Sequence, residues 1–325
     1  MVRKPSTLAA CLVTAALLAL AGCVNPAYTS LAQPSAGATA RPAPVHARLP
    51  ARSGAYLGVY EADVPHSYAL VDRFARTIGR QPNLVLAYSG WGAGFDSEFA
   101  ATARSHGATV IWDLDPTNVS LGEIADGSQD VFLNSYATTV RAYGHPVIIS
   151  FAHEMNGNWY QWGWTHTSPT VWVQAWRHIV TVFDQAGADN VTWLWTVNYD
   201  SLNEGPIRDY WPGAEYVTWI GIDAYYDTPA DNFGSQFEPT IRDIRRFTRK
   251  PILIGETAVG PVAGQASGIP DLFAGVRSWG LLGLVWFDVA QHNGVFHQDW
   301  RLEGQPAAVA AFRNASAAYL ARLYR

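Results

Sequence analysis

Residues 146–154 of this chain are Pro-Val-Ile-Ile-Ser-Phe-Ala-His-Glu, and residues 251–256 are Pro-Ile-Leu-Ile-Gly-Glu. In both stretches a proline precedes a short, mainly apolar run that ends close to a glutamate. Such runs are typical of parallel strands that are buried on both faces. We therefore predict strands over Val147–Ala152 and Ile252–Gly255, each of which delivers one acidic side chain at its carboxyl end.

The rest of the chain repeats this pattern of short apolar or β-branched runs. They predict six more strands, over Ala55–Tyr60, Asn83–Tyr88, Thr109–Leu114, Val191–Val197, Tyr216–Ala224 and Leu282–Phe287. Segments of helical character lie between or after the strands, over Val64–Ile78, Phe95–His106, Val131–Tyr143, Ser168–Ala186, Phe237–Arg249, Ile269–Trp279 and Pro306–Tyr324.

Eight strands alternating with helices predict an α/β fold, a (β/α)8 TIM barrel. An open doubly wound sheet is the alternative. It is less favoured because Tyr60-Glu61-Ala62-Asp63 follows the first predicted strand, where that fold places a glycine-rich phosphate-binding turn.

The composition limits the class of protein. The 325 residues are 49% hydrophobic and 15% charged, which provides a large core and excludes a disordered chain, a coiled coil and a polytopic membrane protein. A net charge of −5 argues against a nucleic-acid partner. The 14 tryptophans exceed the usual needs of a core, which indicates that some stack on flat ligands or sugar rings.

The amino-terminal residues have the features of a bacterial secretory signal. Arg3 and Lys4 precede the apolar run Leu8–Leu20, which is too short for a comfortable membrane span. Leu20-Ala21-Gly22-Cys23 resembles a lipobox, so we expect a lipoprotein signal peptide at 1–22 and a lipid on Cys23. An ordinary signal peptide cleaved nearby is the alternative. Either way, the expected location is extracytoplasmic, anchored to the bacterial cell membrane or secreted.

The domain organisation follows from composition. Residues 23–52 are rich in Ala, Pro and Ser without an apolar period, which predicts a flexible tether. Residues 53–325 contain no further linker, so we expect one catalytic domain. The only other cysteine, Cys11, lies within the predicted signal, so a disulfide within the mature chain is excluded, and we expect a monomer.

Glu154 and Glu256 are the strongest candidates for chemistry. Catalytic residues of a barrel lie at the carboxyl ends of its strands, and the fourth and seventh strands face each other across the mouth. Two carboxyl groups facing one cavity are what glycoside hydrolysis requires. The alternative is that each glutamate forms a structural ion pair, but no arginine lies within ten residues of Glu154.

Other hydrolytic chemistries lack their motifs. His153-Glu154 does not continue as a zinc-protease H-E-x-x-H motif because position 157 is Gly157. His292 and His297 lack the ligand spacing of a metal site, and no G-x-S-x-G elbow is present. We therefore expect neither a metal nor another cofactor.

The fourth-strand segment is also recognisable. His153-Glu154-Met155-Asn156-Gly157, followed by Trp159 and Trp162-Gly163, resembles the acid/base motif of glycoside hydrolase family 26. Gly255-Glu256 is similar to the nucleophile segment of that family. The resemblance extends over the folded domain through Trp211-Pro212-Gly213, Val217–Tyr225 and Asp299-Trp300-Arg301. It implies a (β/α)8 barrel and an enzyme that cleaves β-linked polysaccharide internally with retention of configuration. The substrate that it implies first is β-1,4-mannan, with mixed-linked β-glucan or β-1,3-xylan as alternatives.

The resemblance also implies roles for individual residues. Glu154 becomes the acid/base and Glu256 the nucleophile. His153 would shape the catalytic subsite, and Tyr225 would donate a hydrogen bond that lowers the pKa of the nucleophile. Sugar rings would stack on Trp286 and, in neighbouring subsites, on Trp159 and Trp162. Asn156 and Asn198 would contact sugar hydroxyl groups.

Two alternatives concern single features. His153 could instead be a buried histidine that bonds a neighbouring carbonyl group. A non-catalytic glycan-binding protein on the same barrel is the competing class of function. The presence of both glutamates argues against it, because such a protein commonly loses one of them.

Overall fold

The computed structural model describes residues 48–199, 205–290 and 298–320. The chain divides into two units, Met1–Ala43 and Pro44–Arg325, and the fold belongs to the second. The predicted signal peptide, Cys23 and most of the predicted tether lie outside the described residues, as do His292 and His297. Within the described part of the chain, no helix has the length and apolarity needed to cross a membrane.

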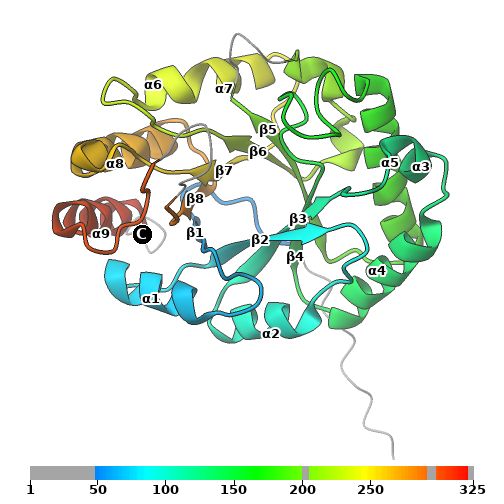
Figure 1. Ribbon diagram of the computed structural model, residues 1–325, viewed down its shortest axis with the longest axis horizontal. Coiled ribbons are helices and arrows are strands. Elements are labelled where there is room, and N and C mark those ends of the chain that lie inside the picture. Colours follow the sequence, from blue (N-terminus) through cyan, green and yellow to red (C-terminus); the bar gives the residue numbers. More distant parts are fainter. Residues whose placement is uncertain (1–47, 200–204, 291–297, 321–325) are drawn as a thin grey trace, which may run out of the picture. The chain divides into compact units, whose positions relative to one another are not determined.

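Eight parallel strands form a closed barrel in the order β1 to β8, which confirms the (β/α)8 fold (Figure 1). The strands are β1 Tyr56–Tyr60, β2 Leu84–Gly90, β3 Thr109–Asp115, β4 Val147–Phe151, β5 Val191–Asn198, β6 Trp219–Asp223, β7 Ile252–Thr257 and β8 Gly283–Phe287. Each coincides with one of the predicted runs, apart from a few residues at the ends.

Helices surround the barrel. They are α1 Ala69–Ile78, α2 Ser97–Ser105, α3 Leu121–Ala125, α4 Asp130–Tyr143, α5 Pro169–Gln185, α6 Phe233–Gln236, α7 Glu238–Ile244, α8 Val262–Ser278 and α9 Pro306–Leu320, with short 3₁₀ turns at Ile207–Tyr210 and Ala214–Tyr216. The predictions differ from the structure at five helices. Helix α1 begins five residues after the predicted Val64, and α7 ends five residues before the predicted Arg249. Helix α8 begins seven residues before the predicted Ile269 and contains Pro270 in its interior, and the short helices α3 and α6 were not predicted.

Two separate apolar clusters hold the fold together. The smaller fills the barrel and is made by side chains that include Leu86, Ile111, Leu194 and Leu253. The larger lies between the strands and the surrounding helices. Because side chains alternate between the two faces of a strand, every second residue points into the barrel. The last inward side chain of each strand therefore reaches the mouth.

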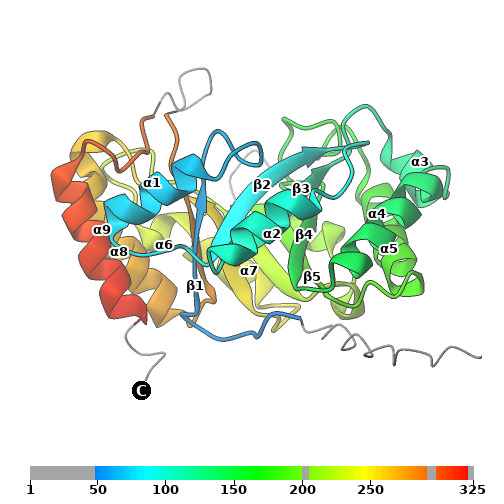
Figure 2. The same cartoon turned by 90° about the horizontal axis from the view of Figure 1, so that it is seen from below.

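The loops that follow the strands gather at one end of the barrel, opposite the end where the chain enters β1 (Figure 2). The ladder between β6 and β7 is irregular at this end: Ile222 pairs with Ile254, but Asp223 pairs with Glu256, which leaves Gly255 as an extra residue. Such a bulge changes the direction of the next side chain. It allows Glu256 to face the mouth although the inward-facing Leu253 lies three positions before it.

Candidate active site

Glu154 lies immediately after β4, in an unusual backbone conformation. Ala152 and Glu154 have φ angles of 47° and 52°, in the left-handed region that residues with a Cβ rarely occupy. The amide of Glu154 donates to the Thr196 carbonyl on β5 at 3.0 Å, which holds this turn against the neighbouring strand. The strained turn thus directs the carboxyl group into the mouth.

Both oxygens of Glu154 accept a hydrogen bond from a neutral donor. The Asn198 Nδ2 donates to Oε1 at 2.7 Å, and the Trp159 Nε1 donates to Oε2 at 2.8 Å. Asn198 is the last residue of β5 and shares the inward-facing side of Leu194 and Thr196. Trp159, on the loop after β4, is 48% exposed. The predicted acid/base is therefore held between a buried strand and a half-exposed indole.

Glu256 is held by two tyrosines. Tyr225 donates from its hydroxyl to Oε2 at 2.6 Å, and Tyr88, at the exit of β2, donates to Oε1. The first of these contacts was predicted and is confirmed. Tyr88 was missed, although it is the last residue of the predicted second strand. Glu256 thus has a donor at each oxygen in a place that is almost closed to solvent.

The pKa of Glu256 moves in the direction opposite to the prediction. Burial and the nearby charge of Glu154 raise this pKa to about 7, while His153 and the hydrogen bond from Tyr225 act in the lowering direction. The predicted effect of Tyr225 is therefore present, but burial outweighs it. The cause is desolvation, which the sequence does not reveal.

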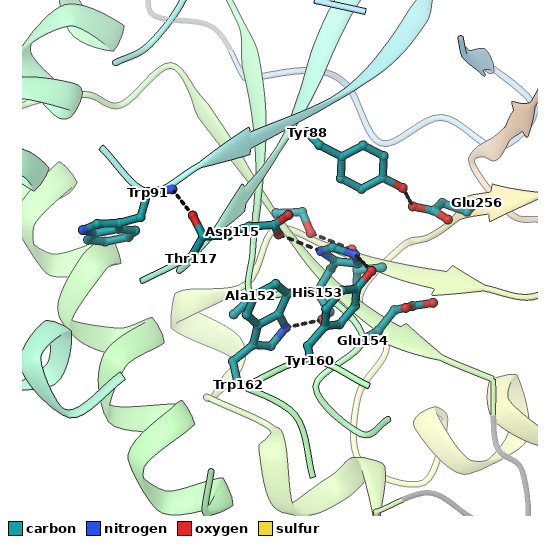
Figure 3. A network of polar contacts seen from close by, with 12 residues as sticks. Tyr88, Trp91, Asp115, Thr117, Ala152, His153, Glu154, Tyr160, Trp162 and Glu256 are labelled. Atoms are coloured by element: carbon teal, nitrogen blue, oxygen red, sulfur yellow. Dashed lines mark hydrogen bonds and ion pairs between the residues drawn. The ribbon is translucent and has the colours of Figure 1, made fainter. Parts of the chain in front are cut away.

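His153 is fully buried beneath the mouth. Its Nδ1 lies 3.1 Å from Oδ1 of Asp115 at the end of β3, and its Nε2 lies 3.1 Å from the Tyr160 hydroxyl (Figure 3). The alternative partner, a backbone carbonyl, is not what the ring nitrogens contact. Both observed partners were missed: Asp115 lies two residues beyond the inward-facing Asp113, a spacing that alternation along β3 could have revealed.

Two more buried acids lie below the glutamates. Burial raises the pKa of Asp113 to about 6 and raises the pKa of Asp223 well above its usual range, with Glu256 and Glu154 adding to the effect at Asp223. Neither carboxyl oxygen of Asp223 has a hydrogen-bond partner. Because an unpaired carboxylate is costly to bury, these surroundings favour the neutral form of Asp223.

Three of these groups lie as close together as the ligands of a metal ion. Ligand atoms of Asp113, His153 and Glu256 lie within 4.8 Å of one another. However, both nitrogens of His153 and both oxygens of Glu256 already have partners. The group therefore does not fit a metal, and its chemistry is that of interacting acids and one base.

The two predicted tryptophan subsites differ from each other. Trp159 is exposed, and its ring covers Gly157 so closely that a Cβ there would lie 2.3 Å from it. Trp162 is only 5% exposed: it stacks on Tyr160 at 4.3 Å and donates to the His153 carbonyl at 2.7 Å. Trp162 thus uses one ring face and its N–H to hold the loop after β4, and its place in a neighbouring subsite stays a prediction.

The prediction for Trp286 is wrong. This side chain is 0% exposed, and it packs outward against Phe312 of α9 at 5.3 Å. Val285 belongs to the barrel interior, so by alternation Phe287 shares its inward face. Phe287 stacks on Tyr60 at 4.5 Å at the mouth. The aromatic ring predicted for this place therefore belongs to the next residue.

Asn156 has a structural task in place of the predicted sugar contact. It is fully buried; its Nδ2 donates to the Asn198 carbonyl and its Oδ1 accepts from the Asn198 amide, each at 2.9 Å. These two hydrogen bonds join the loop after β4 to the end of β5. Asn156 thus positions Asn198, which in turn donates to Glu154.

The closed (β/α)8 barrel thus brings one glutamate at the exit of β4 and another at the exit of β7 to the same mouth, and glycoside hydrolysis uses such a pair of carboxyl groups. Residues 117–249 match the sequence profile of Glycosyl hydrolase family 26. Endoglucanase H from Acetivibrio thermocellus is 28% identical over 81% of this chain and 30% of its own length. A mannan endo-1,4-beta-mannosidase from Bacillus subtilis is 31% identical over 34% of this chain and 29% of its own length.

Solved structures have the same fold. A GH26 beta-mannanase from Bacteroides ovatus superposes with a TM-score of 0.60 at 16% identity, covering 83% of this chain and 90% of its own. An endo-beta-1,4-mannanase double mutant from Cellulomonas fimi gives 0.62 at 16% identity, covering 82% and 72%. Residues 117–249 are thus similar to glycoside hydrolase family 26, and the chain spans about 30% of the length of these two curated relatives.

Proposed function

We propose that this protein is a retaining, endo-acting glycoside hydrolase that cleaves β-linked polysaccharide, with β-1,4-mannan as its preferred substrate. The observation that carries the proposal is the pairing of Glu154 and Glu256 at one mouth, each with a dedicated donor at both oxygens. Donors to both oxygens fix the direction of a carboxyl group, which a displacement at a sugar carbon requires.

In the first step, a carboxylate oxygen of Glu256 attacks the anomeric carbon. The glycosidic C–O bond breaks, and protonated Glu154 gives its proton to the departing oxygen. Tyr88 and Tyr225 hold the two oxygens of Glu256 during the attack. The products are the released sugar chain and an ester between the remaining sugar and Glu256.

In the second step, water attacks the same anomeric carbon. Glu154, now ionised, takes the proton of the water, and the ester bond to Glu256 breaks. Two inversions at one carbon give net retention. The half-exposed Trp159 lies beside the residue that exchanges protons with the leaving sugar and the water, where an incoming chain can reach it.

The substrate proposal draws on the activities for which the relatives are named. Those relatives include mannan endo-1,4-beta-mannosidases, and an endoglucanase aligns with 81% of the chain. The test is to incubate the full-length purified protein with β-mannan, glucomannan, lichenan, β-1,3-xylan and cellulose and to measure reducing ends. We expect the fastest release from mannan and none from the Glu256→Ala variant.

Other results of the same assay would change the proposed substrate or the proposed class of function. Release from lichenan without release from mannan would replace mannan by mixed-linked β-glucan. Binding of a glycan without cleavage would make the protein a glycan-binding barrel and overturn the enzymatic proposal.

We also propose that a lipid on Cys23 anchors the protein, as a monomer, to the outside of the bacterial membrane. The support is the lipobox-like sequence Leu20-Ala21-Gly22-Cys23 after an apolar run. Expression in a bacterium with labelled palmitate should label the wild type and not Cys23→Ala, and light scattering of the detergent-free variant should give a monomer mass. An unlabelled wild type would indicate ordinary secretion.

A further inference from the structure

Acidic groups surround one imidazole in the floor of the site. Asp113 and Asp115 belong to β3, Asp223 to β6 and Glu256 to β7, and Glu154 follows His153 in the chain. In the described residues 48–199, 205–290 and 298–320, no lysine or arginine forms an ion pair with any of these carboxyl groups. His153 is thus the group that can supply positive charge.

The contacts of His153 suit a charged ring. The Nδ1 atom faces a carboxylate oxygen of Asp115, which accepts a proton donor in either charge state. The Nε2 atom faces the hydroxyl of Tyr160, which can accept from an imidazolium or donate to a neutral ring. The hydrogen bonds alone therefore permit both forms, and the surrounding charge decides between them.

Buried acids strongly favour the charged ring. Burial by itself lowers the pKa of His153, but the carboxyl groups of Asp113 and Asp115 raise it. Besides the Asp115 contact at 3.1 Å, one oxygen of Asp113 and one of Glu256 lie within 4.8 Å of a ring nitrogen of His153. The same charge acts on its neighbours, since His153 lowers the pKa of Asp113, Asp223 and Glu256. The tyrosines that face the ring, Tyr88 and Tyr160, carry no charge near neutral pH because burial raises the pKa of each.

The ring has no freedom to leave this position. Tyr160 stacks on Trp162, and the indole of Trp162 donates to the carbonyl of His153 itself (Figure 3). The contact from Asp115 comes from another strand. His153 is therefore held by its backbone and by both of its ring nitrogens, in a place where no sugar can reach it at 1% exposure.

We propose that His153 is a permanent imidazolium, fixed by Asp115 and Tyr160, whose charge keeps the neighbouring Glu256 ionised among the buried acids. His153 is then a positioning residue that acts through the nucleophile and does not touch the sugar. This inference rests on the proposed function only for the role of Glu256. The charge state of His153 can be measured without any substrate.

The first measurement is long-range ¹H–¹⁵N NMR of the full-length protein at pH 8, which distinguishes an imidazolium from both neutral tautomers. One of the nine histidines should show the imidazolium pattern, and His153→Gln should lose that signal. Asp115→Asn provides a second variant that keeps the imidazole. A neutral pattern for His153 at pH 8 would overturn the inference.

The second measurement is the pH dependence of kcat/KM. An opposite charge at this range changes a carboxyl pKa by about 1–3 pH units. The acidic limb of His153→Gln should therefore move to higher pH by at least about one unit, with a smaller move in the same direction for Asp115→Asn. Activity should recover at high pH. The matched control is His178→Gln, which removes an outer histidine paired with Asp130 at 2.6 Å and should leave the limb unchanged.

The outcomes separate this inference from the proposed function. A raised KM with an unmoved acidic limb would make His153 a substrate contact and contradict the inference while the hydrolase assignment stands. An imidazolium at pH 8 in a protein that cleaves none of the polysaccharides would support the charge assignment and contradict the function.

Discussion

The donors that hold the two glutamates differ in their freedom to move. Tyr88 and Tyr225, which hold Glu256, are tied into the mouth of the barrel, and Tyr225 stacks on buried Trp300 at 4.4 Å. Trp159, which holds one oxygen of Glu154, is 48% exposed. A nucleophile must keep one position, whereas an acid/base must exchange protons with a leaving sugar and then with water. The difference in support matches the two proposed roles.

Glu154→Ala should affect substrates according to their leaving group. A polysaccharide needs protonation of its departing oxygen, so turnover should fall by about 10²–10⁴-fold. An activated aryl glycoside needs little protonation, so its first step should survive and the ester at Glu256 should accumulate. Azide needs no general base, and its addition should restore turnover as glycosyl azide. Equal losses on both substrates without azide rescue would contradict the acid/base role.

Gly157→Ala should remove a hydrogen bond of Glu154 although the added methyl group does not contact Glu154. A Cβ at this position would lie 2.3 Å from the ring of Trp159, so the indole must leave and its hydrogen bond to Glu154 is lost. We expect kcat to fall by about 10-fold or more, the effect of losing a strong hydrogen bond. Trp159→Phe should give a similar loss.

Gly264→Ala is the matched control for this prediction, because a Cβ there meets nothing within 4 Å in α8. It should leave kcat unchanged. Wild-type kinetics for Gly157→Ala would show that the indole contact has no part in catalysis.

At the scale of elements, alternation along the strands determines which side chains reach the site. Inward positions continue from the interior cluster to the mouth: Leu86 precedes Tyr88, Ile111 precedes Asp113 and Asp115, and Leu194 precedes Asn198 by four. Counting by two from an interior residue therefore predicts Tyr88, Asp113 and Asp115. The strands themselves were predictable because buried parallel strands have continuously apolar sequences.

The same rule explains the error at β8, but it does not account for the placement of Glu256. The family resemblance implies a stacking ring at Trp286, whereas the register of β8 places this side chain outside the barrel and places Phe287 inside. Glu256 was predicted correctly although strict alternation from Leu253 would turn it outward. The bulge at Gly255 corrects its direction, and this bulge depends on pairing with β6, which local sequence does not determine.

A pair of acids joins the ends of β1 and β8. Glu61 and Asp288 are both buried and share a hydrogen bond between their carboxyl groups, and Oδ1 of Asp288 also accepts from the Leu302 amide at 2.8 Å. Burial, followed by the charge of Asp288, raises the pKa of Glu61 to about 9. The neutral form of Glu61 is thus strongly favoured in the folded state.

Because of this pair, we expect the folded protein to lose stability as the pH rises. Because the folded-state pKa of Glu61 lies above the unfolded value, its contribution is complete below about pH 4.5 and declines as the pH rises towards 9. The melting temperature of the wild type should fall over this range, and Glu61→Gln should show a smaller fall. Asp243→Asn, which removes the partner of Arg246 on α7, is the control and should keep the wild-type pH dependence. Parallel curves for wild type and Glu61→Gln would contradict the shared proton.

At the scale of the whole molecule, the barrel brings together groups that lie far apart in the sequence. The donors and acids of the site come from β2, β3, β5, β6 and β7 and from the loop after β4, so none of their distances follows from local sequence. Closure of the barrel places the exits of β4 and β7 on one mouth. Retention further requires the carboxyl groups of Glu154 and Glu256 to lie about 5–5.5 Å apart, which leaves no room for an intervening water.

The central claim is that Glu256 becomes covalently bound to the sugar during turnover. The direct test is to incubate the full-length enzyme with a 2-deoxy-2-fluoro-β-glycosyl fluoride of the preferred sugar, which forms the ester quickly and hydrolyses slowly, and to map the added mass by peptide mass spectrometry. We predict one fluoroglycosyl group per chain, on Glu256, with inactivation in proportion to labelling. Inactivation with the label on any other residue, or hydrolysis of the reagent with inverted configuration and no label, would contradict it.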